Sequence, residues 1–204
     1  RLNDSIYSNG YAVTDDQKDV PIGGNLKTAD KYKMVNKINQ KFVDVIRATG
    51  GNNANRHLLI PGYNTEFEKT VDAKFVMPTD TAENGKTKLF VSVHYYTPWD
   101  FCGDGGAGSY TYGDRQKTVE YFENLKRFSD EGYAYIIGEC GVCSPQTVTG
   151  SVTTWFNDTF KEAAKYHAVP VLWETGQYFD RTAATLKFKD VAVYFNEING
   201  ANGD

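Results

Sequence analysis

Four polar or aromatic side chains each stand at, or just past, the end of a short apolar run. They are His94, Tyr96, Glu139 and Trp173. An aromatic ring can stack on the flat face of a sugar, and a carboxylate can attack or stabilise the anomeric carbon. Hydroxyl or imidazole donors can keep that carboxylate ionised. The residue types therefore suit the cleavage of a glycosidic bond, provided that the fold brings the ends of the runs together.

Each of these side chains also has an ordinary structural explanation. Glu139 directly follows an apolar run, so its carboxylate would be partly buried, which is costly unless it has a role or a partner in a structural salt bridge. His94 could equally be a hydrogen-bonded core histidine, and Trp173 could belong to the core. Trp99 lies in a glycine-rich loop, where an exposed ring favours binding over packing. Tyr63 follows the first apolar run and joins the candidates for that reason.

Short apolar runs alternate with amphipathic segments along most of the chain. The runs have the composition of strands buried on both faces, and the segments repeat apolar residues at helical spacing. Alternating strands and helices predict βα units and a parallel sheet, with the active site at the carboxyl ends of the strands. The predicted strands are 57–60, 88–93, 133–138 and 169–173, and the predicted helices are centred on 35–46, 119–131, 152–163 and 191–198.

The first 30 residues differ from the rest of the chain. They are polar and rich in turn residues, and we expect a long loop with one short helix there. Further along, Pro61-Gly62 is expected to close the first strand. No linker or change of composition divides the chain, so the sequence predicts a single domain over residues 1–204.

Composition excludes several classes of protein. The chain has 204 residues, 40% of them hydrophobic and 24% charged, as in an ordinary packed domain. A net charge of −4 gives no electrostatic reason to expect nucleic acid or an anionic membrane as partner. No apolar run approaches the roughly 20 residues that span a bilayer. The 29 aromatic residues instead favour a flat, amphipathic ligand such as a sugar.

The cysteines are too few for a disulfide scaffold. Cys140 and Cys143 have the spacing of a redox pair or of half a zinc site, but no second Cys or His pair stands at ligand spacing. With Cys102 they leave two alternatives, one disulfide with a spare thiol or three thiols.

Longer motifs resemble those of glycoside hydrolase family 5 endoglucanases. The segment 38–63 is similar to a helix–strand region of that family, and Val93–Pro98 contains its His-x-Tyr strand end. Ile137–Gly141 resembles its Gly-Glu-x-Gly nucleophile motif, and Leu172–Gly176 its tryptophan-containing eighth strand. Phe179-Asp180-Arg181 continues the similarity, which runs in one order over nearly the whole chain.

The resemblance implies an α/β fold, the (β/α)8 TIM barrel, of which this chain holds strands 5–8. Residues 1–204 would be the C-terminal part of one catalytic barrel. The activity implied is hydrolysis of internal β-1,4-glucosidic bonds in cellulose-type glucans with retention of configuration and without metal or cofactor. The site residues implied are Glu139 as nucleophile, Tyr96 as its hydrogen-bond donor, His94 as a positioning group, and Trp173, Trp99 and Tyr63 as substrate-binding rings.

One element of the family pattern is missing. The family's acid/base glutamate lies in Asn-Glu-Pro, which this chain lacks, and related endoglucanases commonly continue with Arg-Leu, with which this chain begins. A full barrel takes about 250 residues. We therefore expect the acid/base residue upstream of Arg1, in an N-terminal half on the same or a separate chain. Glu174 or Asp100 is the alternative within the chain, although nothing in the sequence selects either.

The motifs leave the exact substrate open. The chain has Glu174-Thr175-Gly176 where the family often has Asp-Asn-Gly, which affects the subsites rather than the reaction. A β-mannanase or a xyloglucanase on the same scaffold is an alternative, and so is a half-barrel that binds glycans without cleaving them. Because polymeric glucan cannot enter a cell, we expect a secreted, extracellular protein.

Overall fold

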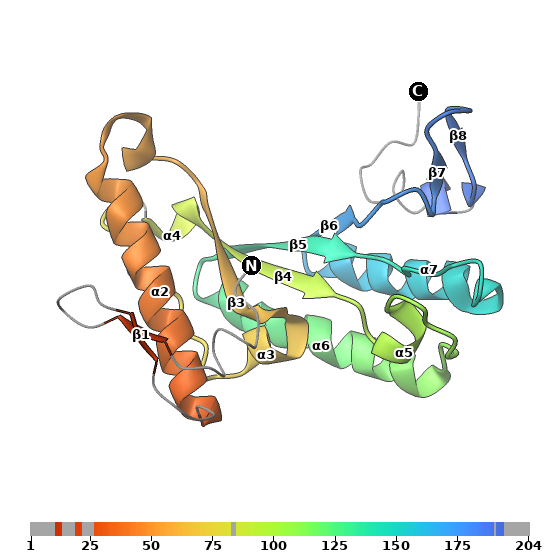
Figure 1. The fold of residues 1–204 in the computed structure, drawn as a ribbon, viewed down its shortest axis with the longest axis horizontal. Helices are drawn as coiled ribbons and strands as arrows, with labels where there is room; N and C mark the ends of the chain where they lie inside the picture. Colours follow the sequence, from red (N-terminus) through yellow and green to blue (C-terminus); the bar gives the residue numbers. More distant parts are fainter. Residues whose placement is uncertain (1–10, 14–18, 22–26, 83–84, 190, 194–204) are drawn as a thin grey trace. The chain divides into compact units, whose positions relative to one another are not determined.

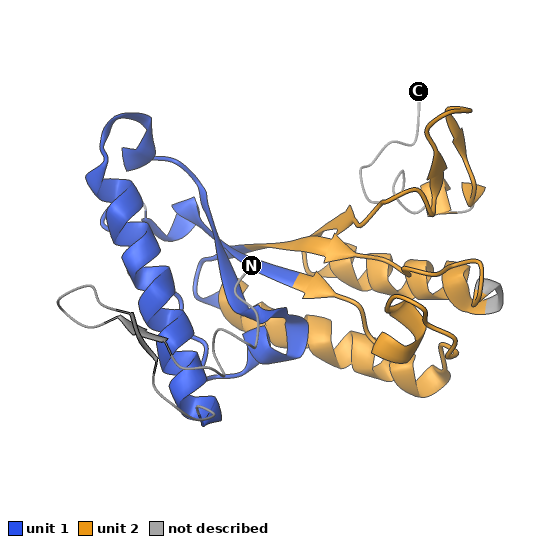
Figure 2. Cartoon of the chain, viewed as in Figure 1, with its two compact units in different colours: residues 1–93, 130–134 blue, residues 94–129, 135–204 orange. Residues whose placement is uncertain are grey.

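Strands and helices alternate along the chain in the order that the apolar runs predict (Figure 1). The computed structural model describes residues 11–13, 19–21, 27–82, 85–189 and 191–193. Contacts divide the chain into two units, which Figure 2 shows in different colours: unit 1 is residues 1–93 and 130–134, and unit 2 is residues 94–129 and 135–204. No helix among the described residues is both long enough and apolar enough to cross a membrane.

The predicted strands form one four-stranded sheet in the order β3-β4-β5-β6. β5 and β6 are parallel, with Ile136 opposite Val169 and Ile137 opposite Pro170. The register then shifts before Cys140, which lies opposite Leu172. The α/β class is thus confirmed. The strands are β3 (Leu58–Glu66), β4 (Leu89–Tyr95), β5 (Ala134–Cys140) and β6 (Val169–Leu172).

The first strand extends further than the sequence predicts. β3 runs through Pro61-Gly62 to Glu66 instead of ending at the proline. Within this sheet β3 is an end strand, where a residue without an N–H is tolerated. A Cβ at Gly62 would lie 1.8 Å from Thr70 Oγ1, so the glycine allows close approach of the following helix rather than a turn.

The expectation of a helix near the N-terminus is not met where the structure describes it. β1 (Tyr11–Val13) and β2 (Asp19–Pro21) form an antiparallel pair, with Ala12 opposite Val20. The other residues of this stretch that precede Lys27 lie outside the described part, as does most of the helix predicted at 191–198; residues 191–193 are helical.

Unit 1 is built around one long amphipathic helix. α2 (Thr28–Ala48) confirms the predicted helix and buries Tyr32, Val35, Asn39 and Val43 at spacings of three and four residues. The buried face differs from the one that the apolar spacing indicates, because Phe42 and Val45 are 41% and 48% exposed. Asn39 Nδ2 donates to Pro61 O of β3 at 2.9 Å. The other elements of the unit are η1 (Gly51–Ala54), α3 (Phe67–Val71) and α4 (Gly85–Lys88).

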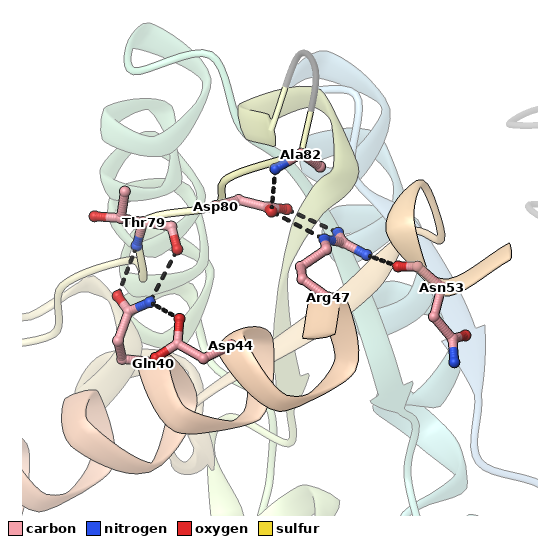
Figure 3. Close-up of polar contacts among 7 residues, drawn as sticks. All are labelled: Gln40, Asp44, Arg47, Asn53, Thr79, Asp80 and Ala82. Carbon is pink, nitrogen blue, oxygen red and sulfur yellow. Dashed lines mark hydrogen bonds and ion pairs between the residues drawn. The ribbon is translucent and has the colours of Figure 1, made fainter. Parts of the chain in front are cut away.

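Polar side chains of α2 hold the segment that follows α3 against the helix (Figure 3). Gln40 Oε1 accepts from Thr79 N at 2.9 Å, and its Nε2 donates to Thr79 O at 3.0 Å. Arg47 donates from Nε and Nη2 to the two oxygens of Asp80 at 2.9 and 2.7 Å. The side chains of Arg47 and Asp80 are only 6% and 1% exposed. This is a buried bidentate ion pair, whose geometry offsets the cost of removing both charges from water.

Unit 2 has a core of aromatic rings. The Tyr95 ring stacks on Trp155 with centroids 5.9 Å apart and meets Phe122 edge-on at 5.4 Å. Trp155 in turn meets Phe156, which meets Phe160, both edge-on. These rings join β4 to two helices through offset and edge contacts. Besides β5 and β6, the elements of this unit are α5 (Trp99–Cys102), α6 (Tyr112–Asp130), α7 (Thr149–Lys165), β7 (Phe179–Asp180) and β8 (Thr185–Leu186).

The ion pair in unit 1 gives a prediction for stability. Asp80→Ala leaves the Arg47 guanidinium buried without its partner, and should lower the free energy of unfolding by about 3–5 kcal/mol at neutral pH. Removing Asp30, whose pair with Lys33 is exposed, should cost less than about 1 kcal/mol. Urea unfolding of the parent and both variants measures the difference; equal effects of Asp80→Ala and Asp30→Ala would contradict it.

The same pair should make stability depend on pH. The hydrogen bond from Arg47, opposed in part by burial, holds the pKa of Asp80 below its ordinary value. A lowered carboxyl pKa in the folded state stabilises the fold above the ordinary pKa, and this contribution is lost as pH falls through the lowered one. The stability difference between the parent and Asp80→Ala should therefore be full at neutral pH and shrink in strongly acidic solution, in urea titrations over that range.

Candidate active site

Two donors from the end of β4 meet one oxygen of Glu139, which lies near the end of β5. His94 Nδ1 lies 3.1 Å from Glu139 Oε2. Tyr96 Oη donates to the same oxygen at 3.2 Å. The structure therefore brings together the three residues that the sequence proposes for catalysis, all within unit 2.

The cluster is mostly buried but still partly exposed to solvent. The side chains of His94 and Glu139 are 14% and 24% exposed. Burial, and after it the negative charge of Glu139, raises the pKa of Tyr96 well above its ordinary value. Tyr96 therefore keeps its proton at neutral pH and acts toward Glu139 as a donor.

The pairing of β5 with β6 sets the position of Glu139. The register shift lies between Ile137 and Cys140, a span that includes Glu139. Such irregularities change the direction of side chains at strand ends. Beyond the shift, Trp173 N donates to Cys140 O at 2.8 Å, and Cys140 Sγ lies 3.5 Å from Val171 O. The backbone on the C-terminal side of Glu139 is thus fixed to β6.

The indole rings of Trp99 and Trp173, both in unit 2, are exposed to solvent. Trp99 is 68% exposed, and its ring meets Tyr96 edge-on with centroids 6.2 Å apart. The segment that carries Tyr96 and Trp99 is fixed by Trp155, whose Nε1 donates to Thr97 O at 2.8 Å. Trp173, directly after β6, is 43% exposed. Both rings are accessible, as binding to a flat ligand requires; the roles assigned to them stay predictions.

Tyr63 is placed differently. It lies within β3 in unit 1 and is 3% exposed. Its ring meets Tyr32 edge-on at 5.2 Å, and Lys69 Nζ lies 4.8 Å from the ring centre. These contacts favour a packing role. Substrate binding by Tyr63 stays a prediction.

The segment that follows Trp173 has a structural role that no sequence motif indicates. Glu174 accepts hydrogen bonds from Gly176 N and, at 2.8 Å, from Tyr178 N, so its carboxylate holds a turn. Tyr178 is 2% exposed and binds the backbone of Val142 through its hydroxyl. No motif points to this contact, because it joins residues 36 positions apart.

A pocket of about 480 Å³ is lined by Glu174, Thr175, Gly176, Phe179, Asp180, Arg181 and Lys187.

The cysteines are three free thiols, the second of the two alternatives. Burial raises the pKa of Cys140 to about 12 and that of Cys102 well above its ordinary value. Burial also raises the pKa of Cys143. Since the thiolate is the reactive form, none of these groups has the low pKa of a redox-active cysteine. Among the residues that the structure describes, no three His, Cys, Asp or Glu side chains form a metal-binding group.

Barrel-type glycoside hydrolases carry their catalytic carboxylates at strand ends, and this chain has both the fold and such a carboxylate. The chain belongs to the cellulase family, glycosyl hydrolase family 5, which it matches over residues 14–202. The family fold is a (β/α)8 barrel, so the predicted fold is confirmed, and the four-stranded sheet is part of such a barrel. The numbering of its strands as 5–8 stays a prediction.

Individual relatives agree with this assignment. Endoglucanase A of Paenibacillus barcinonensis is 33% identical over 169 residues, which are 71% of this chain and 42% of the relative. A xyloglucan-specific endo-beta-1,4-glucanase of Bacteroides ovatus is 30% identical over 200 residues, 84% of this chain and 38% of the relative. A family 5 xyloglucanase from Paenibacillus pabuli, solved with ligand, is 28% identical with a TM-score of 0.72, covering 86% of this chain and 58% of that one. The chain spans about two fifths of the length of these two curated relatives.

The contact between Tyr96 and Glu139 can be tested without substrate. Replacing the charged group in Glu139→Gln removes one cause of the raised pKa of Tyr96, so that pKa should fall toward its ordinary value. Nuclear magnetic resonance of tyrosine labelled with ¹³C at Cζ follows each phenol through its titration. Burial raises the pKa of Tyr110 to about 12, and Glu139 is not among the causes, so Tyr110 should titrate unchanged. An unchanged Tyr96 would show that the two groups do not interact.

Proposed function

We propose that this chain contributes the nucleophile of a retaining endo-β-1,4-glucanase. The observation that carries the proposal is the convergence of His94 Nδ1 and Tyr96 Oη on one oxygen of Glu139. Family membership and the named activities of the relatives, endoglucanase and xyloglucan-specific endoglucanase, support it. A solved relative with bound cellotriose, a broad-specificity endoglucanase from Ruminococcus champanellensis, supports a glucan as the substrate class.

In this proposal the Glu139 carboxylate attacks the anomeric carbon and forms a covalent glycosyl-enzyme. The leaving oxygen takes a proton from a second carboxyl group, which then removes a proton from the water that hydrolyses the intermediate. Two donors on Oε2 restrict the rotation of the Glu139 carboxylate before attack. Because Tyr96 retains its proton, it stabilises the charged nucleophile rather than competing with it.

The second carboxyl group is proposed to come from outside residues 1–204. Retention requires it about 5–5.5 Å from the nucleophile. Glu174, one of the two alternatives within the chain beside Asp100, uses both carboxylate oxygens to accept backbone N–H groups of its own turn. The share of the relatives' length that the chain spans also supports a contribution from an N-terminal half, on the same or a separate chain.

Trp99 and Trp173 are proposed to stack on sugar rings, since both are exposed in the unit that holds Glu139. Cellulose-type β-1,4-glucan is the proposed substrate, and xyloglucan is the second candidate because two relatives are named for it. A polymeric substrate also leads us to propose that the protein acts outside the cell.

Glu139→Gln should abolish turnover. In the complete gene product, kcat on an aryl β-cellobioside should fall by roughly 10³-fold or more, because the covalent step is removed, while binding of cellotetraose is largely retained. Glu162→Gln is the matched control: Glu162 pairs with Lys165 on α7 and should leave kcat unchanged. Stopped assays for kcat and calorimetry for binding measure the two effects. Full activity of Glu139→Gln would overturn the proposed function.

Chemical rescue by azide distinguishes the two possible roles of Glu139, nucleophile and acid/base. In Glu139→Ala the added anion can occupy the place of the missing carboxylate and attack the same face of the sugar. The expected product is the α-glycosyl azide, inverted relative to the β-linked substrate. A β-glycosyl azide would instead make Glu139 the acid/base, and magnetic resonance of the product distinguishes the two.

The indole rings should contribute to binding more than to stability. Trp99→Ala and Trp173→Ala should each weaken productive sugar binding by about 1 kcal/mol, seen as a roughly fivefold rise in KM. Thermal unfolding should change little for Trp99→Ala, because that ring is mostly exposed. Unchanged kinetics of both variants on cellulose-type glucan and on xyloglucan would contradict a sugar-binding role for these rings.

A further inference from the structure

The hydroxyl of Tyr178 binds both backbone polar groups of one residue close to the nucleophile. Val142 N donates to Tyr178 Oη at 2.8 Å, and Tyr178 Oη donates to Val142 O at 2.6 Å. Both contacts are fully buried. Burial raises the pKa of the Tyr178 phenol above its ordinary value, so the group stays neutral and can donate and accept at once.

Val142 is connected to Glu139 through a segment with little freedom. Cys140 O accepts from Trp173 N, which fixes the residue after Glu139. Gly141 follows with φ of +151°, a conformation rare for other residues, and a Cβ there would lie 3.8 Å from Tyr178 Oη. The backbone is therefore fixed on the near side by β6 and on the far side by Tyr178.

Tyr178 is itself held by two further contacts. Its backbone N donates to Glu174 Oε2 at 2.8 Å, within the turn that follows Trp173. Its ring meets Phe156 edge-on with centroids 5.5 Å apart. Tyr178 thus connects the segment that follows β5, the strand that carries Glu139, to the segment after β6, which carries Trp173.

We propose that Tyr178 is a positioning residue for Glu139, acting through the backbone of Val142. Its hydroxyl fixes the direction in which the chain leaves the nucleophile, and so keeps the Glu139 carboxylate against His94 and Tyr96. The kinetic consequence rests on the proposed function, whereas the position of Glu139 does not.

Tyr178→Phe removes the hydroxyl and keeps the ring against Phe156. In the complete gene product it should lower kcat about tenfold with KM changed less than about twofold, because a nucleophile displaced by a fraction of an ångström reacts slowly. Crystal structures of the parent and the variant should show Glu139 moved from at least one of its two contacts, at 3.1 and 3.2 Å in the parent.

Tyr110→Phe is the matched control. It too removes a tyrosine hydroxyl in unit 2, but one that is half-buried and lies 3.2 Å from Thr118 Oγ1 rather than binding the backbone near Glu139. It should leave kcat, KM and the position of Glu139 unchanged. Hydrogen exchange of the Val142 amide, slow in the parent and in Tyr110→Phe, should become fast in Tyr178→Phe, and this measurement needs neither crystals nor activity.

The outcomes separate the two proposals. An inactive parent would contradict the proposed function, and the crystal structures and amide exchange would then decide the role of Tyr178 alone. A Tyr178→Phe variant with the parent's kcat, with Glu139 in place, or with a raised KM and unchanged kcat would overturn the positioning role. Fast exchange of the Val142 amide in the parent would overturn it too, since the contact would then be absent in solution.

Discussion

A carboxylate at the end of a buried strand must be solvated by the protein, because little water reaches it. Glu139 meets this requirement with an imidazole nitrogen and a phenol hydroxyl that both come from the end of the neighbouring strand β4. That arrangement depends on adjacent strands ending together. Pairing of strands therefore determines the chemistry of the site, and the helices and loops of unit 2 serve to hold the strand ends in place.

Hydrogen bonds connect the aromatic core of unit 2 to the segments that flank the site. Trp155 packs on Tyr95 and donates to Thr97 O, which fixes the loop that carries Trp99. Phe156, next along α7, packs on Tyr178, whose hydroxyl binds Val142. One helix thus supports the segments after both β4 and β5. Burial of large rings, which supplies stability, here also supplies the precision that a reacting carboxylate needs.

Local sequence patterns predicted the strands of the four-stranded sheet and the long helices, because each depends on spacing within a few residues. Strand-end residues could be identified since parallel strands place their carboxyl ends together. The patterns were wrong at Pro61, where position at the end of the sheet permits a proline within a strand. They also could not find Tyr178, because its contact with Val142 depends on three-dimensional packing and has no periodicity.

Glu139 and Glu174 show why residue type alone does not define a catalytic group. Both follow apolar runs; Glu139 is the penultimate residue of β5, and Glu174 lies two residues beyond the end of β6. The oxygens of Glu174 accept backbone N–H groups, so that carboxylate stabilises a turn. Glu139 Oε2 instead meets side-chain donors in a cluster that solvent still reaches. The partners of a carboxylate, rather than its place in the sequence, therefore distinguish the candidate nucleophile Glu139 from Glu174, which stabilises a turn. In the proposed mechanism, the acid/base partner of Glu139 has to be a carboxyl group that is not already bound to the backbone.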